Sequence, residues 1–194
     1  MFMTAEKLPW KDLEEEVRNV PLLEQRDGET IYPYAEATIK LRKFAFHEVR
    51  PSSLYVLSAN LALQRSLFIE LGKLGIDPLN LKGRVVLHDT TGGAISMIPP
   101  IVEETPEDGK YILDGLHRTY LGKAMGRTVF WGIHITGIRE DCPAAARPNG
   151  WEDIKIWDSV PADIKQKRRY RQADYLKLRR DFSAINGSKP RFAG

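Results

Sequence analysis

The segment Tyr111–Gly126 constrains the fold more than any other part of this chain. Its first three residues, 111–113, are apolar and predict a short strand, and Asp114-Gly115 predicts a turn. The apolar residues after the turn recur at helical spacing: Leu116, Tyr120, Leu121 and Ala124. Gly126 stands where a left-handed C-cap glycine ends a helix. The segment therefore predicts a strand that turns sharply into a helix.

Such a corner is suited to hold an anion. The first turn of a helix leaves backbone N–H groups unpaired at its positive end. Gly115 permits close approach to these groups, and His117 and Arg118 add side-chain donors beside them. We therefore expect a nucleotide phosphate to bind here.

The same residues also allow a purely structural interpretation. Asp-Gly is a common turn between a strand and a helix, and Asp114 can cap the helix that follows. Arg118 would then pair with a surface carboxylate. Under the anion-binding interpretation, in contrast, we expect Arg118 to face solvent when no ligand is bound.

The composition is that of an ordinary soluble globular protein. The chain has 194 residues, of which 42% are hydrophobic and 28% charged, enough for one domain with a proper core. One cysteine cannot form an internal disulfide, which fits a reducing cytoplasm, and four dispersed histidines do not match the spacing of a zinc site. The N-terminal residues contain no long apolar stretch, so we expect neither a signal peptide nor a membrane span.

The net charge of +3 conceals an asymmetry. Residues 151–194 hold 11 basic and 6 acidic residues, whereas residues 1–150 hold 18 basic and 20 acidic ones. Eight cations fall within one short stretch: Lys165, Lys167, Arg168, Arg169, Arg171, Lys177, Arg179 and Arg180. Because phosphates attract cations and Tyr170 and Tyr175 can stack on bases, we expect this stretch to bind DNA without sequence specificity. The alternative is a solvated helix face with a few ion pairs.

Pattern and composition divide the chain into four parts. Residues 1–36 predict an N-terminal helical extension, and residues 37–138 hold the core. Within the core, the apolar spacing and flanking residues of 58–75 predict a long helix. Residues 139–150 are rich in Pro, Ala and Gly and predict a linker, while residues 151–194 predict a basic helical segment packed on the core.

A polar, glycine-rich loop follows the strand expected near residue 87. Asp89-Thr-Thr-Gly-Gly93 can present backbone amides and two hydroxyl groups to a ligand, and it equally suits an ordinary turn. We include Thr90 and Thr91 among the candidate phosphate-binding residues.

The ordered set of motifs resembles the ParB/sulfiredoxin superfamily. In that superfamily a first strand and a Pro-Ser turn precede an apolar Pro-Ile-x-Val strand, a hairpin, an Asp/Gly-Gly-x-x-Arg corner and a helix ending in Gly. The corresponding segments here are Ile39–Phe46, Val49–Val56, Ile98–Val102, Gly109–Arg118 and Lys123–Gly126. The resemblance covers roughly residues 38–136. It implies an α/β fold: a small mixed β-sheet flanked by helices, with N- and C-terminal helical extensions.

Two departures from the superfamily pattern narrow the activities that it implies. Sulfiredoxins carry a reactive Cys immediately before the His-Arg pair, where this chain has Leu116, and Cys142 lies beyond the last core strand. ParB partition proteins continue into a helix-turn-helix domain and a dimerisation domain, for which 194 residues leave too little length. We therefore expect neither cysteine-based phosphoryl-sulfinyl chemistry nor sequence-specific centromere binding.

Among the small stand-alone members, the chain is most similar to plasmid-encoded fertility-inhibition proteins of the oncogenic-suppression type. Such proteins block conjugative or T-DNA transfer through a type IV secretion system and are associated with ATPase and DNase activity. The resemblance therefore implies ATP (or another nucleotide) and Mg²⁺ as cofactors. It implies DNA and a type IV secretion coupling protein as partners.

In this interpretation the corner both binds and activates the nucleotide. Five residues are expected to hold the phosphates: Asp114, Gly115, Leu116, His117 and Arg118. His117 and Arg118 also belong to the expected catalytic set, where Arg118 stabilises the negative charge of phosphoryl transfer. Glu103 and Asp114 are the expected metal ligands, and Glu103 is also the expected catalytic carboxylate because it follows a strand whose end should open onto the corner. Glu104 and Asp108 are expected to be surface charges.

Two other functions fit the same motifs. Some members of the superfamily phosphorylate free serine with ADP or ATP, so a small-molecule kinase is one alternative. The other is a non-enzymatic DNA- or protein-binding module whose corner is structural. Turnover assays with free serine and with DNA separate the two enzymes, and nucleotide binding without hydrolysis would indicate the module.

Overall fold

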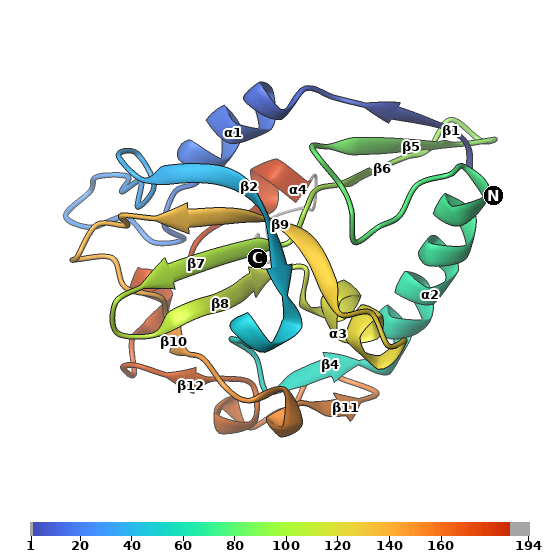
Figure 1. Ribbon diagram of the computed structural model, residues 1–194. Coiled ribbons are helices and arrows are strands. Elements are labelled where there is room, and N and C mark those ends of the chain that lie inside the picture. Colours follow the sequence, from blue (N-terminus) through green and yellow to red (C-terminus); the bar gives the residue numbers. More distant parts are fainter. Residues whose placement is uncertain (1, 187–194) are drawn as a thin grey trace.

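A five-stranded mixed sheet forms the centre of the computed structural model, which describes residues 2–186 (Figure 1). Its strand order is β2-β9-β7-β8-β3. The strands are β2 (Thr38–Ala45), β3 (Arg50–Pro51), β7 (Ile101–Thr105), β8 (Gly109–Asp114) and β9 (Val129–Thr136). The pairs β2–β9 and β7–β8 are antiparallel, and the pairs β7–β9 and β3–β8 are parallel. The predicted α/β class with a mixed sheet is confirmed.

Both faces of this sheet are buried. Alternate residues of a strand point to opposite faces, so Phe130 and Ile133 of β9 belong to different clusters. On one face Ile133 packs with Leu13 and Val17 of α1 (Trp10–Arg18). On the other face Phe130 joins a cluster that includes Phe46, at the start of the 3-10 helix Phe46–Glu48. Helices and loops therefore enclose the sheet.

A second sheet supports the longest helix. Its three antiparallel strands have the order β1-β5-β6 and are β1 (Phe2–Lys7), β5 (Val85–Asp89) and β6 (Ala94–Met97). Helix α2 (Ser58–Lys73) packs on this sheet through buried Leu67 and Leu71 and lies beside α3 (Leu116–Ala124) (Figure 1). The helix expected over 58–75 is confirmed. Strand β1 was not expected in the N-terminal extension, because its ladder forms with residues about 80 positions away.

The C-terminal part, predicted to be a linker and a helical segment, contains very little α-helix. Its strands are β10 (Ala146–Arg147), β11 (Lys155–Trp157) and β12 (Arg169–Tyr170). Its helices are three 3-10 helices, Trp151–Asp153, Ile164–Gln166 and Tyr175–Leu178, and the short α4 (Ser183–Asn186). The end of the predicted helical segment, residues 187–194, lies outside the described residues.

Distant hydrogen bonds account for this difference. Strand β11 pairs in parallel with β4 (Tyr55–Leu57), and β12 pairs with β10 across the segment predicted to be a linker. Backbone groups that bond to distant strands cannot also form the i to i−4 bonds of a helix. The segment 139–150 contains the buried residues Cys142 and Ala144 and thus contributes to the core. Among the described helices, none combines the length and apolar character needed to cross a bilayer.

Candidate functional site

The predicted corner is present at the junction of β8 and α3. Strand β8 ends at Asp114, and α3 begins at Leu116. Gly115 between them has φ 82°, in the left-handed region, and a Cβ there would lie 2.9 Å from Cβ of Pro100. Gly115 occupies the N-cap position, so the cap residue offers no side-chain acceptor to the first turn of α3. Both the backbone conformation and the close packing require glycine at this position.

A pocket of about 350 Å³ opens at the corner. Residues of α2, β6, the β4 region and the C-terminal part complete its walls. The lining residues are Ser53, Tyr55, Leu63, Gln64, Leu67, Ile95, Ser96, Met97, Ile98, Leu113, Asp114, Gly115, Leu116, His117, Arg118 and Arg168. We call this space the corner pocket. It brings together all five predicted phosphate-binding residues of the corner.

Three polar atoms buried around the corner pocket have no hydrogen-bond partner among the described residues. They are Oε1 of Gln64, Oγ of Ser96 and Nε of Arg118, contributed by α2, β6 and α3. Buried polar atoms are normally hydrogen-bonded. Arg84 and Asn149 also carry unpartnered buried atoms but do not line this pocket. These three atoms thus come from three different elements around one space.

Arg118 is buried, although the sequence suggested that it faces solvent. Only 6% of the residue is exposed, and its Nη2 donates a hydrogen bond to the carbonyl oxygen of Ile98 at 2.5 Å. Burial lowers the pKa of Arg118 to about 10, and the charge of Asp114 opposes this effect. The guanidinium therefore stays protonated at neutral pH and keeps one N–H directed to no protein acceptor.

His117 links the corner to the start of α2. The backbone N–H of Leu57 donates to Nε2 of His117 at 3.0 Å. Because Nε2 accepts this bond, the proton of the neutral imidazole resides on Nδ1. His117 therefore lines the corner pocket while it fixes α3 against β4.

Glu103 does not line the corner pocket, contrary to the expected catalytic and metal-binding roles. It lies in the middle of β7 and is completely buried. Its carboxylate accepts hydrogen bonds from the hydroxyl groups of Tyr34 and Tyr111, the latter at 2.6 Å. Arg180 adds a buried ion pair, with Nε 2.9 Å from Oε1 and Nη2 3.2 Å from Oε2. The sequence placed Glu103 at a strand end, but β7 continues to Thr105 and the side chain points to internal donors.

Thr90 and Thr91, expected to bind phosphate, also lie apart from the corner pocket. Thr90 and Thr91 form the exposed turn between β5 and β6, where Oγ1 of Thr91 donates to Asp89 at 2.7 Å. Neither threonine is among the lining residues, and this geometry is that of an ordinary hairpin turn. Asp108, expected at the surface, is buried and pairs with Arg171.

The basic stretch 165–180 divides into different environments. Arg171 and Arg180 form ion pairs inside the protein, and their side chains are 12% and 2% exposed. Arg169 pairs with Asp153 at 3.1 Å and Lys177 with Asp174 at 2.7 Å, both near the surface. Arg168 reaches the corner pocket. The stretch is therefore not one continuous solvated cationic face.

Residues 12–159 match the family model of the ParB CE domain. The chain belongs to this family. Membership confirms the ParB-like superfamily that the motifs indicated. No curated protein and no solved structure matches the chain. The ParB CE match includes every residue that lines the corner pocket except Arg168.

Sequence reasoning missed two polar residues that the ParB CE fold brings to the corner. Gln64 precedes Leu67, Phe68 and Leu71 at helical spacing, so it is a polar interruption of an apolar stripe. A polar residue within an apolar stripe is a sequence signal that could have identified Gln64 as a candidate site residue. Ser96 lies on β6, far from the corner in sequence, and no local pattern links it to Arg118. Only the packing of the second sheet brings Ser96 to the pocket.

Proposed function

We propose that the corner pocket binds a nucleotide and holds its phosphates at residues 115–118. The observation that carries this proposal is the incomplete hydrogen bonding of Gln64, Ser96 and Arg118 around one pocket. A buried guanidinium beside the first turn of a helix suits phosphate oxygens, because both the charge and the helix dipole favour an anion. Gly115 supplies the left-handed turn that leads into α3 and packs closely against Pro100.

The walls of the corner pocket suit the rest of a nucleotide. Leu63, Leu67, Ile95 and Met97 provide apolar surface for a flat heterocyclic base. The unpartnered oxygen of Gln64 can accept a hydrogen bond from a base or ribose. The volume, about 350 Å³, lies within the range of small-molecule sites.

Asp114 is the one carboxylate among the residues that line the corner pocket. Magnesium in nucleotide sites often binds one or two carboxylates together with substrate phosphates. Across residues 2–186, no group of three His, Cys, Asp or Glu side chains is arranged to hold a metal by itself. A single carboxylate in the corner pocket fits Mg²⁺ that enters with ATP and is held by Asp114 together with the phosphates.

The bound nucleotide is, in this proposal, hydrolysed, and the protein acts on DNA. Arg118 would stabilise the charge that develops on the transferred phosphoryl group. The biological role proposed is that of a plasmid-borne fertility-inhibition factor of the oncogenic-suppression type, with ATPase and DNase activity and a type IV secretion coupling protein as partner. Membership of the ParB CE family supports a ParB-like protein, and the finer role rests on the resemblance of the sequence motifs, including the Gly-Leu-His-Arg corner.

One observation favours a second candidate, a nucleotide-binding module without turnover. The carboxylate of Glu103 accepts hydrogen bonds from two tyrosine hydroxyl groups and from Arg180, and it lies outside the corner pocket. The corner pocket is left with Asp114 as its carboxylate to orient a water molecule or a metal. Binding of a nucleotide could then control an interaction with DNA or protein instead of driving hydrolysis.

Calorimetric titration with ATP and Mg²⁺, followed by a phosphate-release assay with and without DNA, tests these proposals. We expect wild-type protein to bind ATP and release phosphate, and Arg118→Lys to weaken both. Arg84→Lys is a matched control, because Arg84 also has an unpartnered Nε but lines a different pocket. No binding by wild type would reject the nucleotide site, and binding without phosphate release would select the second candidate. DNA degradation that chelators abolish would support the DNase activity.

A further inference from the structure

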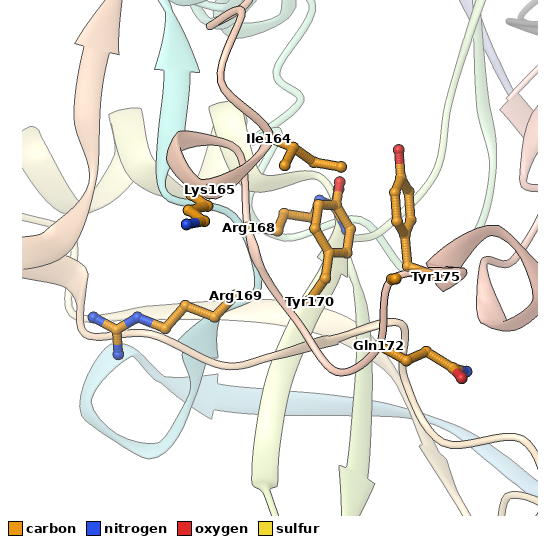
Figure 2. A pocket seen from close by; sticks show the side chains of 8 residues that line it. Ile164, Lys165, Arg168, Arg169, Tyr170, Gln172 and Tyr175 are labelled. Atoms are coloured by element: carbon orange, nitrogen blue, oxygen red, sulfur yellow. The ribbon is translucent and has the colours of Figure 1, made fainter.

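A second pocket adjoins the corner pocket. Its volume is about 380 Å³, and Figure 2 shows the side chains around it. The lining residues are Ile164, Lys165, Arg168, Arg169, Tyr170, Gln172, Ala173 and Tyr175. Arg168 lines both spaces, so the two pockets are neighbours. The two pockets therefore have the Arg168 side chain as a common wall.

Two stacked tyrosines form one wall of this second pocket. The rings of Tyr170 and Tyr175 have centroids 3.8 Å apart and an angle of 24° between their planes. Both residues are only partly buried. We call the pair the tyrosine shelf. An aromatic face that is already held in place loses little conformational freedom when a base stacks on it.

The backbone around the tyrosine shelf is fixed to the wall of the corner pocket. Tyr170 belongs to β12, which pairs with β10. The carbonyl oxygen of Lys167 accepts hydrogen bonds from the N–H of Leu54 at 3.0 Å and from Oγ of Ser53 at 3.3 Å. Ser53 itself lines the corner pocket. The two pockets are thus joined by a short, hydrogen-bonded piece of structure.

The charge around the tyrosine shelf suits a polyanion. Lys165, Arg168 and Arg169 line this pocket and no carboxylate does, while Arg169 also pairs with Asp153 at 3.1 Å. Figure 2 shows Arg168 beside Tyr170, with Lys165 and Arg169 on the same side of the ring pair. A cationic groove with aromatic side chains is the arrangement that binds single-stranded nucleic acid, because phosphates follow the charges and bases stack on the rings.

We propose that the tyrosine shelf stacks a base of single-stranded nucleic acid whose neighbouring phosphate lies at Arg168 and whose next nucleotide enters the corner pocket. This inference rests on the proposed phosphate site at the corner. A base inside a duplex has no free face, so the tyrosine shelf selects single strands. A free mononucleotide occupies the corner pocket alone and does not need the shelf.

Fluorescence polarisation with labelled oligo-dT and oligo-U, and calorimetry with ATP, test the proposal on the full chain. Tyr175→Leu should weaken oligonucleotide binding about tenfold, since a stacked base contributes on the order of that factor, and should leave ATP affinity unchanged. Tyr175→Trp should restore binding, because it restores an aromatic face. Tyr32→Leu, at a tyrosine that is 41% exposed and outside both pockets, is the matched control and should bind like wild type.

Comparison of oligo-dT with oligo-U shows whether DNA or RNA binds more tightly. Weaker binding of either oligonucleotide by Tyr175→Leu supports the tyrosine shelf. Unchanged oligonucleotide binding in a folded Tyr175→Leu protein would overturn the inference, as would equal affinity for duplex DNA. If wild type binds oligonucleotides through Tyr175 but does not bind ATP, the proposed function fails while the tyrosine shelf remains.

Discussion

Arg118 and Arg180 are equally buried, each with 6% of the residue exposed, but their surroundings differ. Each nitrogen of Arg180 donates to protein acceptors: Glu103 and the carbonyl oxygens of Cys142, Pro143 and Leu178. Arg118 donates to the carbonyl oxygen of Ile98, and its Nε has no partner.

The pKa values of the two arginines follow the same division. Burial acts to lower the pKa of Arg180, but the charge of Glu103 and the neighbouring tyrosines outweigh it and raise the pKa above the usual value. For Arg118, burial prevails over the charge of Asp114 and lowers the pKa to about 10. Removing a partner from a fully paired buried charge is strongly destabilising, whereas the incompletely paired Arg118 is the residue that we propose binds an external anion.

The largest effect, on stability, is expected for a substitution of the fully paired arginine, Arg180. Arg180→Met should lower the free energy of unfolding by about 3–5 kcal/mol, because it leaves the Glu103 carboxylate buried without a cation. Urea denaturation measures this loss. Adding Glu103→Gln should recover part of it, since the uncompensated charge is then gone. A loss below about 1 kcal/mol, as for an exposed ion pair, would contradict the structural role.

Arg118→Lys should produce the next largest effect, on binding. A hydrogen bond to a charged group contributes about 1.5–3 kcal/mol, and Lys cannot copy the forked geometry of a guanidinium. Nucleotide affinity should therefore fall by about one to two orders of magnitude. The free energy of unfolding should also fall, in contrast to the expectation for a solvent-facing arginine, because the bond to Ile98 is buried. Thermal-shift and calorimetric titrations separate the two effects.

Gln64→Leu should change stability and binding in opposite directions. It removes a buried oxygen that has no protein partner, so the free energy of unfolding without ligand should stay the same or rise by about 1 kcal/mol. Nucleotide affinity should fall several-fold, because one ligand contact is lost. Ser96→Ala should behave likewise. A clear loss of stability without ligand would show that Gln64 has an internal role.

The smallest effect is expected for the single cysteine. Cys142 is buried and burial raises the pKa of its thiol, which disfavours the nucleophilic thiolate. Cys142→Ser should leave nucleotide hydrolysis and nuclease activity unchanged and cost little stability. Loss of activity in a folded Cys142→Ser protein would assign the thiol a chemical role.

The corner could be predicted from sequence because its signals are local. An apolar run, Asp114-Gly115 and a helical repeat ending in Gly126 lie within sixteen residues, and the structure has β8 and α3 at those positions. The long helix α2 was predicted for the same reason. In each case neighbouring residues determine the element.

The role of Arg180 could not be predicted in this way. Its partner Glu103 is 77 residues away. Of the three carbonyl oxygens that it contacts, those of Cys142 and Pro143 belong to an irregular segment and that of Leu178 ends a 3-10 helix. In sequence, Arg180 is one of eight similar cations, and only tertiary packing assigns it to the core. The prediction of a helical segment after residue 151 was wrong for the same physical reason. Strands β11 and β12 of this segment form backbone hydrogen bonds to β4 and β10, which lie far away in sequence.

Calorimetric titration of ATP with Mg²⁺ into wild type, Arg118→Lys and Arg84→Lys tests the central claim most directly. We expect saturable binding by wild type and by Arg84→Lys, and affinity about 10–100-fold weaker for Arg118→Lys. Equal affinity of all three folded proteins would place the nucleotide elsewhere and leave the corner pocket without its proposed ligand.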